Sequence, residues 1–507
     1  MVFLALLPII WLVIGLGFLK MPGYKACPIA VVIAAIVAVF AFDMPTLDTG
    51  TAALEGVALA IWPILLVIVA AIFAYNLTVY TKSMDVLKQM LTTVSKDSRI
   101  LALLIGWGFG TFMEGMAGFG TAVAIPASIL VGLGFNPIRA ILACLIANTV
   151  PTTFGSIGIP TTTLASLTEL DPVRLATYIT TQLGLLDILC PFLMVIVIGG
   201  SVRALKGVFF VTLLSGLALF IPEYIISSVL GPELAVMVPS IIIMGVIVVY
   251  AKLFKTDDPD YALDIQPQSV SAGAGIRAAM IFILIFIFLI ITSKLVPAVN
   301  GPLSAVKTAV PIYTGAGAKP YTFVWIATPG IMILLAAILG GRYQGASFGE
   351  IFGRLGETIY NLRFTFLTII TVVATAKIMT YSGMTASIAH TLVDVTGTMY
   401  PAFAPLAGAL GAFITGSGTN SNVLFGPLQT AAAMDIPGAD PAWLAACNSA
   451  GAGLGKMLSP QSIAIAIGAV GAVVEGKESE IMKAALPYLV GFMIIAGAIT
   501  YFGQMMI

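Results

Sequence analysis

Charge is the scarcest feature of this 507-residue sequence. Asp, Glu, Lys and Arg together make up 9% of it, against 59% hydrophobic residues. A soluble globular protein carries roughly 25% charged residues, because its surface must be solvated by water. The composition therefore excludes a soluble globular protein and indicates a surface that faces lipid.

Several long stretches contain no charged residue at all. These stretches are 1–19, 56–81, 234–251, 320–341 and 484–507. A membrane-spanning helix needs about 20 mostly apolar residues, and strands of a membrane barrel would alternate in polarity instead. The first stretch has no basic segment before it and no clear cleavage site, so we interpret it as a helix rather than a signal peptide. The sequence predicts an all-α polytopic membrane protein with roughly 12 to 14 transmembrane segments.

The residues and motifs of common enzymes are also missing. The sequence has a single histidine, and its four cysteines lie in separate apolar stretches without metal-ligand spacing. It contains no HExxH, no P-loop and no C-x-x-C motif. We therefore expect no enzymatic activity, no metal and no cofactor, and buried cysteines that act as small apolar side chains. No basic patch suggests a nucleic-acid partner, and without an ATPase motif the energy source should be an ion gradient.

Two parts of the chain resemble each other at an offset of about 300 residues. Segments 148–163 and 448–463 carry Asn, Gly and Pro at the same spacing, and Phe, Gly and Pro upstream of them also match. We predict two related halves with the following bounds: an N-terminal half 1–255 with a repeat core 52–175, a linker loop 256–276, and a C-terminal half 277–507 with a repeat core 352–475.

The distribution of Lys and Arg predicts how the halves are oriented. Basic residues follow the first and third predicted spans, whereas the loop 43–52 between the second and the third has none. The positive-inside rule then places the N-terminus outside and the two cores in opposite orientations. Inverted-topology repeats are common in secondary transporters, where the binding site lies at the midplane between them.

Glycine and small polar residues gather inside the two cores, in 106–126 and 408–427. Such segments form weak helices, and non-helical backbone at membrane depth is tolerated only where it is buried or lines a cavity. We expect broken or re-entrant helices around one central site, although single glycines could serve helix packing instead. The glycines expected at these breaks are Gly115, Gly118, Gly120, Gly155, Gly416, Gly418 and Gly455.

Glu114 lies within the first glycine-rich segment and Lys456 within the second Asn–Gly–Pro block, at a predicted membrane depth where a charge is functional by default. Glu114 aligns with Thr415 of the other half, and Lys456 aligns with Ser156. A charge present in only one half suggests a task performed once. Our hypothesis is that Lys456 attracts a substrate carboxylate and Glu114 takes up a coupling proton, since burial favours the neutral form of a carboxyl group. The alternative is a structural pair without a role in transport.

Uncharged polar residues around the two candidates could hydrogen-bond a small anion with a hydroxyl group. They are Asn148, Thr149, Thr152, Thr153, Asn448, Ser449, Ser459 and Gln461, together with the adjacent cluster Thr419, Asn420, Ser421 and Asn422. Three further charges, Asp187, Arg363 and Lys377, lie in apolar runs and are expected to reach water from helix ends. His390 is expected at the membrane interface, with a proton relay as the alternative.

The motifs around these residues resemble those of the lactate permease family, which includes glycolate permeases. They are EGMAGFGTAVAIPASILVGLGFNP (114–137), ANTVPTTFGSIGIP (147–160), GTNSNVLFGPLQ (418–429), GKMLSPQSIAIA (455–466) and GKES (476–479). The resemblance extends over nearly the whole chain and includes both Glu114 and Lys456. It implies a prokaryotic plasma-membrane symporter that imports L-lactate, D-lactate or glycolate with a proton. A sodium-coupled anion transporter stays open as an alternative, and so does a receptor or channel.

Overall fold

A computed structural model of the protein describes residues 1–507 except 20, 119, 255–257, 264–269 and 294. The predicted linker 256–276 therefore lies partly outside the described residues. The N-terminal part of the chain folds into α1 (Val2–Ala5), α2 (Leu7–Leu12), α3 (Gly23–Ala41), α4 (Thr46–Leu59), α5 (Leu66–Tyr80) and α6 (Ser83–Thr92). The first core and its flanking helices are α7 (Ser98–Ala102), α8 (Gly110–Met116), α9 (Thr121–Gly132), α10 (Pro137–Ala147), α11 (Gly155–Thr168), α12 (Pro172–Gly199), α13 (Phe209–Val229) and α14 (Met237–Leu253).

The C-terminal part repeats the alternation of long helices and short helix pairs. Its first elements are α15 (Ala272–Ile291), α16 (Pro297–Ala305), β1 (Lys307–Val310), β2 (Tyr321–Val324), α17 (Pro329–Tyr343), α18 (Phe348–Asn361), α19 (Arg363–Tyr381) and α20 (Met384–Thr396). The second core follows as α21 (Tyr400–Thr415), α22 (Gly418–Asp435), α23 (Pro441–Lys456) and α24 (Pro460–Val470), and α25 (Glu478–Gln504) ends the chain.

Long apolar helices confirm the predicted class of an all-α polytopic membrane protein. Among the described residues, eight helices are long and apolar enough to cross a membrane, or nine if α10 counts as one span with the bent segment formed by the short 3₁₀ helix η4 (Pro151–Phe154) and α11. Five shorter apolar helices accompany them, including α9, α14 and α24. The strands β1 and β2 pair antiparallel, and β2 occupies the start of the charge-free stretch 320–341, whose helix α17 begins only at Pro329. They are only four residues long and largely exposed, so they do not change the class.

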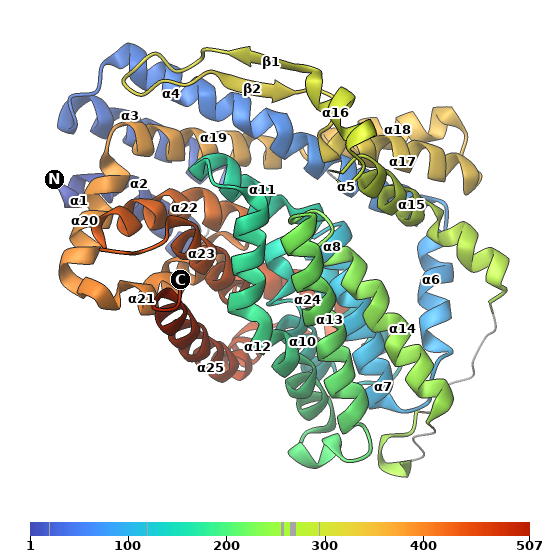
Figure 1. The fold of residues 1–507 in the computed structure, drawn as a ribbon. Coiled ribbons are helices and arrows are strands. Elements are labelled where there is room, and N and C mark those ends of the chain that lie inside the picture. The colour runs from blue at the N-terminus through green and yellow to red at the C-terminus, as the bar shows by residue number, and fades with distance from the viewer. Residues whose placement is uncertain (20, 119, 255–257, 264–269, 294) are drawn as a thin grey trace.

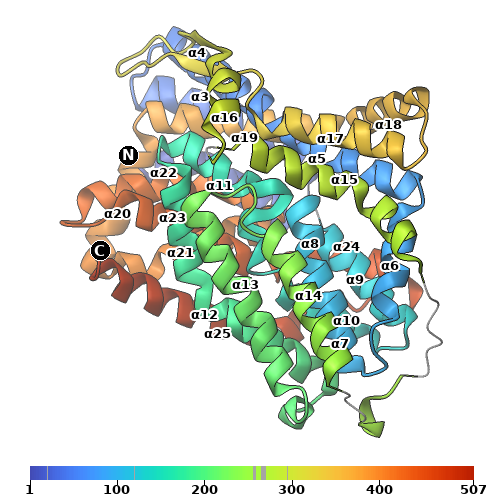
Figure 2. The same cartoon turned by 45° about the vertical axis from the view of Figure 1, so that its right-hand side comes forward.

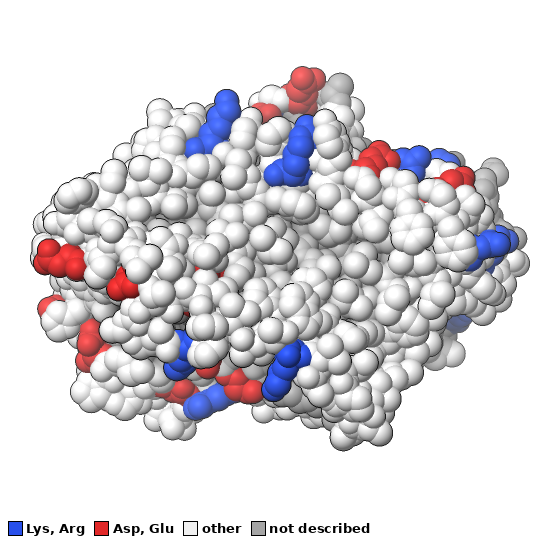
Figure 3. Space-filling model, turned by 90° about the horizontal axis from the view of Figure 1, so that it is seen from above, with Lys and Arg blue, Asp and Glu red and all other residues white. Residues whose placement is uncertain are grey.

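The helices form two layers (Figure 1). The first layer, which we call the slab, contains α3, α4, α5, α15, α17 and α19, with the β1–β2 hairpin beside α4. The second layer, which we call the core bundle, contains the broken helices α8–α11 and α21–α24 together with α12, α13 and α25. Figure 2 shows the same division after a 45° turn. Seen from above, the surface has a broad uncharged expanse with charges scattered around its margins (Figure 3). Such a surface is suited to lipid.

The helices of both cores break where glycine and proline predict that they should. Between α8 and α9, Gly118 and Gly120 have φ of +59° and +86°, and between α21 and α22, Gly416 has φ of +68°. L-residues rarely adopt this left-handed region, whereas glycine does so at little cost. The chain bends by 58° between α10 and the segment that includes α11. The two cores thus share the order helix, break, helix; their inverted orientation remains a prediction.

The other charged residues in apolar runs are placed differently from our expectation. Asp187 lies in the middle of α12 and is fully buried, and Lys377 of α19 is buried in an ion pair with Glu55. Snorkelling from helix ends is therefore wrong for both, because each side chain points into a helix interface rather than toward water. Arg363 does begin α19 and is exposed. His390 is exposed on α20, and its Nδ1 lies 3.4 Å from Oδ2 of Asp435. All four cysteines are free and buried, as predicted.

Candidate functional site

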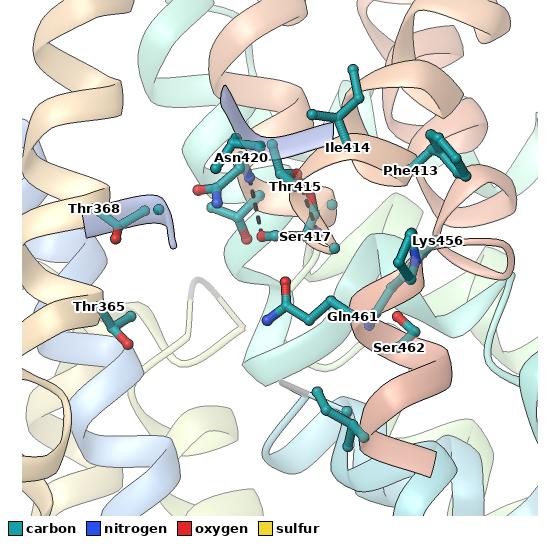
Figure 4. Close-up of a pocket in the computed structure, with 18 of the residues that line it drawn as sticks. Thr365, Thr368, Phe413, Ile414, Thr415, Ser417, Asn420, Lys456, Gln461 and Ser462 are labelled. Carbon is teal, nitrogen blue, oxygen red and sulfur yellow. Dashed lines mark hydrogen bonds between the residues drawn. The ribbon is translucent and has the colours of Figure 1, made fainter. Parts of the chain in front are cut away.

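A cavity of about 1060 Å³ lies between the slab and the core bundle. Its slab side is formed by α3 and α19, including Thr365 and Thr368, and its other side by the broken helices of both cores. Figure 4 shows the threonines of α19 facing Ser417, Asn420 and Gln461 across this space. The broken helices of both halves thus contribute to the wall of one cavity, and its role as a binding site stays a prediction.

Lys456 and Glu114 meet at the wall of this cavity. The Nζ atom of Lys456, the last residue of α23, lies 2.8 Å from Oε1 of Glu114 on α8. Their side chains are only 8% and 3% exposed, so the pair is almost completely shielded from solvent. A buried ion pair needs additional hydrogen bonds to offset the loss of hydration. Its surroundings provide them.

Two polar side chains from the break after α10 complete the ion pair. Lys456 Nζ donates to Oγ1 of Thr152 at 3.3 Å. With the amide of Asn148 oriented to satisfy the donors and acceptors on both sides, Nδ2 donates to Oε2 of Glu114 at 2.9 Å. Its Oδ1 then accepts from Lys456 Nζ at 3.3 Å. Both carboxylate oxygens of Glu114 are therefore bonded, and both halves of the chain contribute to one charge cluster.

The tight geometry of the cluster depends on Gly155. A Cβ atom at this position would lie 2.5 Å from Oε1 of Glu114, closer than such atoms approach in real structures. Glycine therefore lets the backbone between η4 and α11 lie directly against the carboxylate. Gly118 and Gly416 play similar parts, since a Cβ atom at either would clash with Ser156 or Gln461.

Half-helix N-termini from three breaks open toward the same cavity. Helix α24 begins with Pro460 after the N-cap Ser459, and its first turn presents Gln461 and Ser462 to the cavity. Helix α22 begins after the N-cap Ser417, whose Oγ accepts from the backbone N–H of Asn420 at 3.2 Å. Pro160 near the start of regular helix in α11 also lines the wall. Helix N-termini carry partial positive charge and free N–H groups, which favour an anion.

The sequence-predicted polar residues fall into two groups. One group lines the cavity: Glu114, Thr152, Thr419, Asn420, Lys456 and Gln461, with the glycines Gly118, Gly120, Gly155, Gly416 and Gly418. The other group is buried but is not on the wall: Asn148, Thr149, Thr153, Ser421, Asn422, Asn448, Ser449 and Ser459, with Gly115 and Gly455.

The second group largely forms hydrogen bonds inside the core bundle. Asn422 Nδ2 donates to the carbonyl of Pro160 at 3.0 Å and to Oγ of Ser449 at 3.1 Å. Asn448 Nδ2 donates to Oδ1 of Asn422 at 3.0 Å. These bonds join α11, α22 and α23. Side chains already satisfied in this way are better placed to hold the broken helices together than to contact a ligand.

Several cavity residues were not selected from the sequence. Thr415 and Ser156 are the repeat counterparts of Glu114 and Lys456, and both line the cavity. The repeat alignment therefore contained the signal for these two. Thr365 and Thr368 lie on a long continuous helix of the slab, where no local break marks them. Nothing in the sequence pattern alone places them opposite the core bundle.

The side chains that line the cavity define which ligands it can hold. No group of three or more His, Cys, Asp and Glu side chains that could hold a metal ion occurs among the described residues. The chemistry that the cavity offers is one buried cation, the buried carboxyl group of Glu114, the exposed carboxyl group of Glu478, hydroxyl and amide groups, and helix N-termini. This set suits reversible binding of a small anion.

The fold and the cavity define a polytopic membrane protein whose broken helices surround a site for a small polar solute. Comparison with known proteins identifies the family. A family model described as L-lactate permease matches residues 1–507, and the chain belongs to this family. It is therefore a transporter rather than an enzyme.

Curated relatives agree with this assignment over most of the chain. An L-lactate permease of Streptococcus iniae is 45% identical over 87% of this chain and 93% of its own length. An L-lactate permease of Bacillus subtilis is 34% identical and the glycolate permease GlcA of Escherichia coli is 33% identical, each over 98% of this chain and 94% of its own length.

Two solved transporter structures align at low similarity. The YdaH transporter of Alcanivorax borkumensis is 14% identical with a TM-score of 0.48, over 90% of this chain and 87% of that one. MtrF of Neisseria gonorrhoeae is 13% identical with a TM-score of 0.45, over 86% of this chain and 80% of that one.

Proposed function

We propose that this protein is a secondary active transporter that imports L-lactate, and also D-lactate or glycolate, together with a proton. The observation that carries the proposal is the Glu114–Lys456 ion pair on the wall of a cavity that helix N-termini surround. The names of the relatives support the substrate class, since they are L-lactate and glycolate permeases. We infer the coupling to protons from the competition between the substrate carboxylate and Glu114 for Lys456.

In the empty site, the carboxylate of Glu114 is paired with the ammonium group of Lys456, the buried cation of the cavity. A substrate carboxylate competes with it for Lys456, and two carboxylates beside one ammonium group would leave an uncompensated buried charge. Protonation of Glu114 removes this conflict, because the neutral acid releases Lys456 to the substrate. Substrate anion and proton then enter together, and the loaded site carries the same net charge as the empty one.

The remaining polar groups of the cavity suit a 2-hydroxy acid. The first turn of α24, with Gln461 and Ser462, provides N–H and side-chain donors near Lys456 for the carboxylate. Hydroxyl groups of Thr152, Ser156 and Thr415 line the same wall and can pair with the substrate hydroxyl. A pocket built to bond a hydroxyl rejects analogues that lack it, because its own polar groups are then left unpaired.

Access to the site would alternate between the two sides of the membrane. The cavity lies between the slab and the core bundle, so a movement of one layer against the other can open it first to one side and then to the other. We propose that the halves 1–255 and 277–507 provide this movement through inverted repeat cores, in the plasma membrane of a prokaryote with the N-terminus outside. The bias of Lys and Arg among the loops supports this orientation.

Transport by purified protein in liposomes tests the proposal. An imposed proton gradient should drive accumulation of radiolabelled L-lactate, and D-lactate or glycolate should compete with it. A sodium gradient imposed alone should not drive accumulation; accumulation with sodium and none with protons would instead establish the sodium-coupled alternative. Currents far above the turnover of a carrier would indicate a channel.

A second experiment isolates the role of Glu114. The variant Glu114→Gln keeps the size of the side chain but cannot change its protonation. It should lose proton-driven accumulation while it still exchanges internal for external lactate at equal pH, because exchange requires no release of the proton. Undiminished proton-driven accumulation in this variant would contradict the role of Glu114.

A further inference from the structure

A second pair of buried carboxyl groups lies outside the cavity, between α12 and α13. Asp187 of α12 and Glu223 of α13 are both fully buried, and neither lines the cavity. The helices approach closely here: a Cβ atom on Gly216 of α13 would lie 2.8 Å from Cα of Ile188. The two carboxyl groups interact electrostatically. Two acidic side chains therefore lie buried in the interface between α12 and α13.

These carboxyl groups have almost no hydrogen-bond partners. Neither oxygen of Asp187 has a partner, and Oε2 of Glu223 has none. Glu223 Oε1 accepts one bond, from Oγ1 of Thr180 at 3.3 Å. An ionised carboxylate cannot stay buried without hydrogen bonds or a counter-charge, and so it takes up a proton instead. Asp187 in particular has nothing around it that would stabilise a negative charge.

The basic residues near both ends of this interface are engaged elsewhere or exposed. Arg99 of α7 pairs with Asp97 at 2.7 Å, and Arg174 of α12 pairs with Asp440 at 2.6 Å. Lys456 of α23 is bound to Glu114, and Lys483 of α25 is exposed. The other titratable groups on the helices packed against α12 include the buried thiols of Cys144, Cys190 and Cys447. None of these groups supplies a positive charge to Asp187 or Glu223.

Residues of the break after α10 lie between this interface and the ion pair of the cavity. Cys190 lies one turn after Asp187 on α12, and its Sγ is 3.6 Å from Oγ1 of Thr149. Thr149 is the neighbour of Asn148, whose Nδ2 donates to Glu114 Oε2 at 2.9 Å. The break after α10 thus contacts Cys190, one turn from Asp187, on one side and the Glu114–Lys456 pair on the other.

We propose that Asp187 and Glu223 form a second proton-binding site, which exchanges its proton with Glu114 during transport. The inference rests on the proposed proton coupling. A proton that leaves the Asp187 acid group is taken up by the carboxylate of Glu114 and is replaced from solution, so charge and atoms balance. Repulsion between two neighbouring carboxylates keeps at least one of the pair protonated throughout. The two acids are positioning and relay residues and do not touch the substrate.

The alternative is that both acids are neutral at all times and serve only to fill space. Neutral isosteric variants separate the two possibilities. Asp187→Asn and Glu223→Gln preserve size and polarity, and a space-filling role would leave transport unchanged. A matched control is Thr212→Val on α13, because the hydroxyl group of this buried threonine bonds only to the backbone of its own helix.

The experiment compares two modes of lactate transport in proteoliposomes, using radiolabelled L-lactate. In Asp187→Asn and in Glu223→Gln, the rate of proton-driven uptake should fall at least about tenfold, as expected when a proton-transfer group is lost. Lactate exchange at equal pH on both sides should stay within about twofold, as should both modes in Thr212→Val. Wild-type rates of proton-driven uptake in both acid variants would overturn the inference. If wild-type protein itself shows no proton-driven accumulation, the proposed function has failed instead.

If a variant loses both modes of transport, infrared spectroscopy can still test whether Asp187 and Glu223 hold a proton. Infrared spectra of wild-type protein at neutral pH should contain the C=O stretch of protonated carboxylic acids, and Asp187→Asn and Glu223→Gln should each weaken it. Absence of that change in both variants would show that the two groups hold no proton, and would overturn the inference whatever the transport rates are.

Discussion

Among the described residues, two lysine–glutamate ion pairs are buried, with the same N–O distance but different surroundings. Lys456–Glu114 and Lys377–Glu55 both have an N–O distance of 2.8 Å, and none of the four side chains is more than 10% exposed. The first joins two helix breaks in the core bundle and lines the cavity. The second joins α4 and α19 within the slab, and neither of its residues lines the cavity.

The second pair is held by aromatic side chains and close helix packing. Tyr381 donates to Oε1 of Glu55 at 2.7 Å, and its ring stacks on that of Tyr313 with centroids 3.8 Å apart. A Cβ atom on Gly56 would lie 2.6 Å from Cα of Ala374 across the α4–α19 contact. A salt bridge between two continuous, tightly packed helices fixes them relative to each other. A salt bridge between helix breaks beside a cavity can open when a ligand or a proton arrives.

We expect the largest loss of lactate uptake from a substitution that breaks the Glu114–Lys456 ion pair. Lys456→Gln removes the cation that we assign to the substrate carboxylate, and loss of one partner of a buried, hydrogen-bonded charge pair should lower uptake about 100-fold. The matched variant Lys377→Gln removes the same charge from the slab and should leave the KM for lactate within about threefold. Radiolabelled uptake over a range of lactate concentrations measures both. An unchanged KM in Lys456→Gln would contradict the assignment of the two pairs.

The second effect concerns stability rather than transport. Loss of one member of the slab pair leaves the other charged and buried, which costs about 3–5 kcal/mol. Lys377→Met should therefore lower the thermal unfolding temperature strongly, and the double variant Glu55→Gln with Lys377→Met should recover most of the loss. Thermal unfolding of the purified variants measures this. If the double variant were less stable than Lys377→Met alone, the slab pair would not be the clamp that we describe.

The contrast between the two pairs also explains what sequence reasoning could find. The charge-free stretches predict the polytopic class because lipid excludes charge from long helices. Glycine and proline predict the breaks because their backbone preferences act locally. Glu114 and Lys456 stand out because they are charged residues inside those breaks. Each of these signals is local, and each leads to the core bundle.

The slab side of the site depends on tertiary contacts that no local signal encodes. Thr365 and Thr368 reach the cavity only because α19 packs beside α3, and Lys377 finds Glu55 more than 300 residues away in the sequence. Conversely, Asn422 and Asn448 looked like ligand-binding residues because they are polar and lie in the second core. The structure shows them bonded to each other.

A substitution at Gly155 tests whether transport depends on the geometry of the Glu114–Lys456 ion pair. Gly155→Ala places a methyl group 2.5 Å from Oε1 of Glu114 and should push the carboxylate away from Lys456. Overpacking of about 1–3 kcal/mol corresponds to a loss of roughly tenfold in proton-driven uptake. The control is Gly132→Ala on α9, where a Cβ atom would meet no heavy atom within 4 Å. Normal uptake by Gly155→Ala would mean that the pair tolerates displacement and is not needed in this geometry.

The smallest expected effects concern two residues at the start of α24, of which Ser459 is structural and Gln461 faces the ligand. Ser459 is the N-cap of α24 but is buried away from the cavity, whereas Gln461, two residues later in the first turn, lines it. Ser459→Ala should destabilise the protein by about 1 kcal/mol, as measured by thermal unfolding, and leave the KM for lactate unchanged. Gln461→Ala should do the reverse and raise the KM a few fold, by about the net contribution of one hydrogen bond. An equal rise of the KM for lactate in Ser459→Ala and Gln461→Ala would contradict this distinction. It would show that the N-terminus of α24 acts on the substrate as one rigid unit.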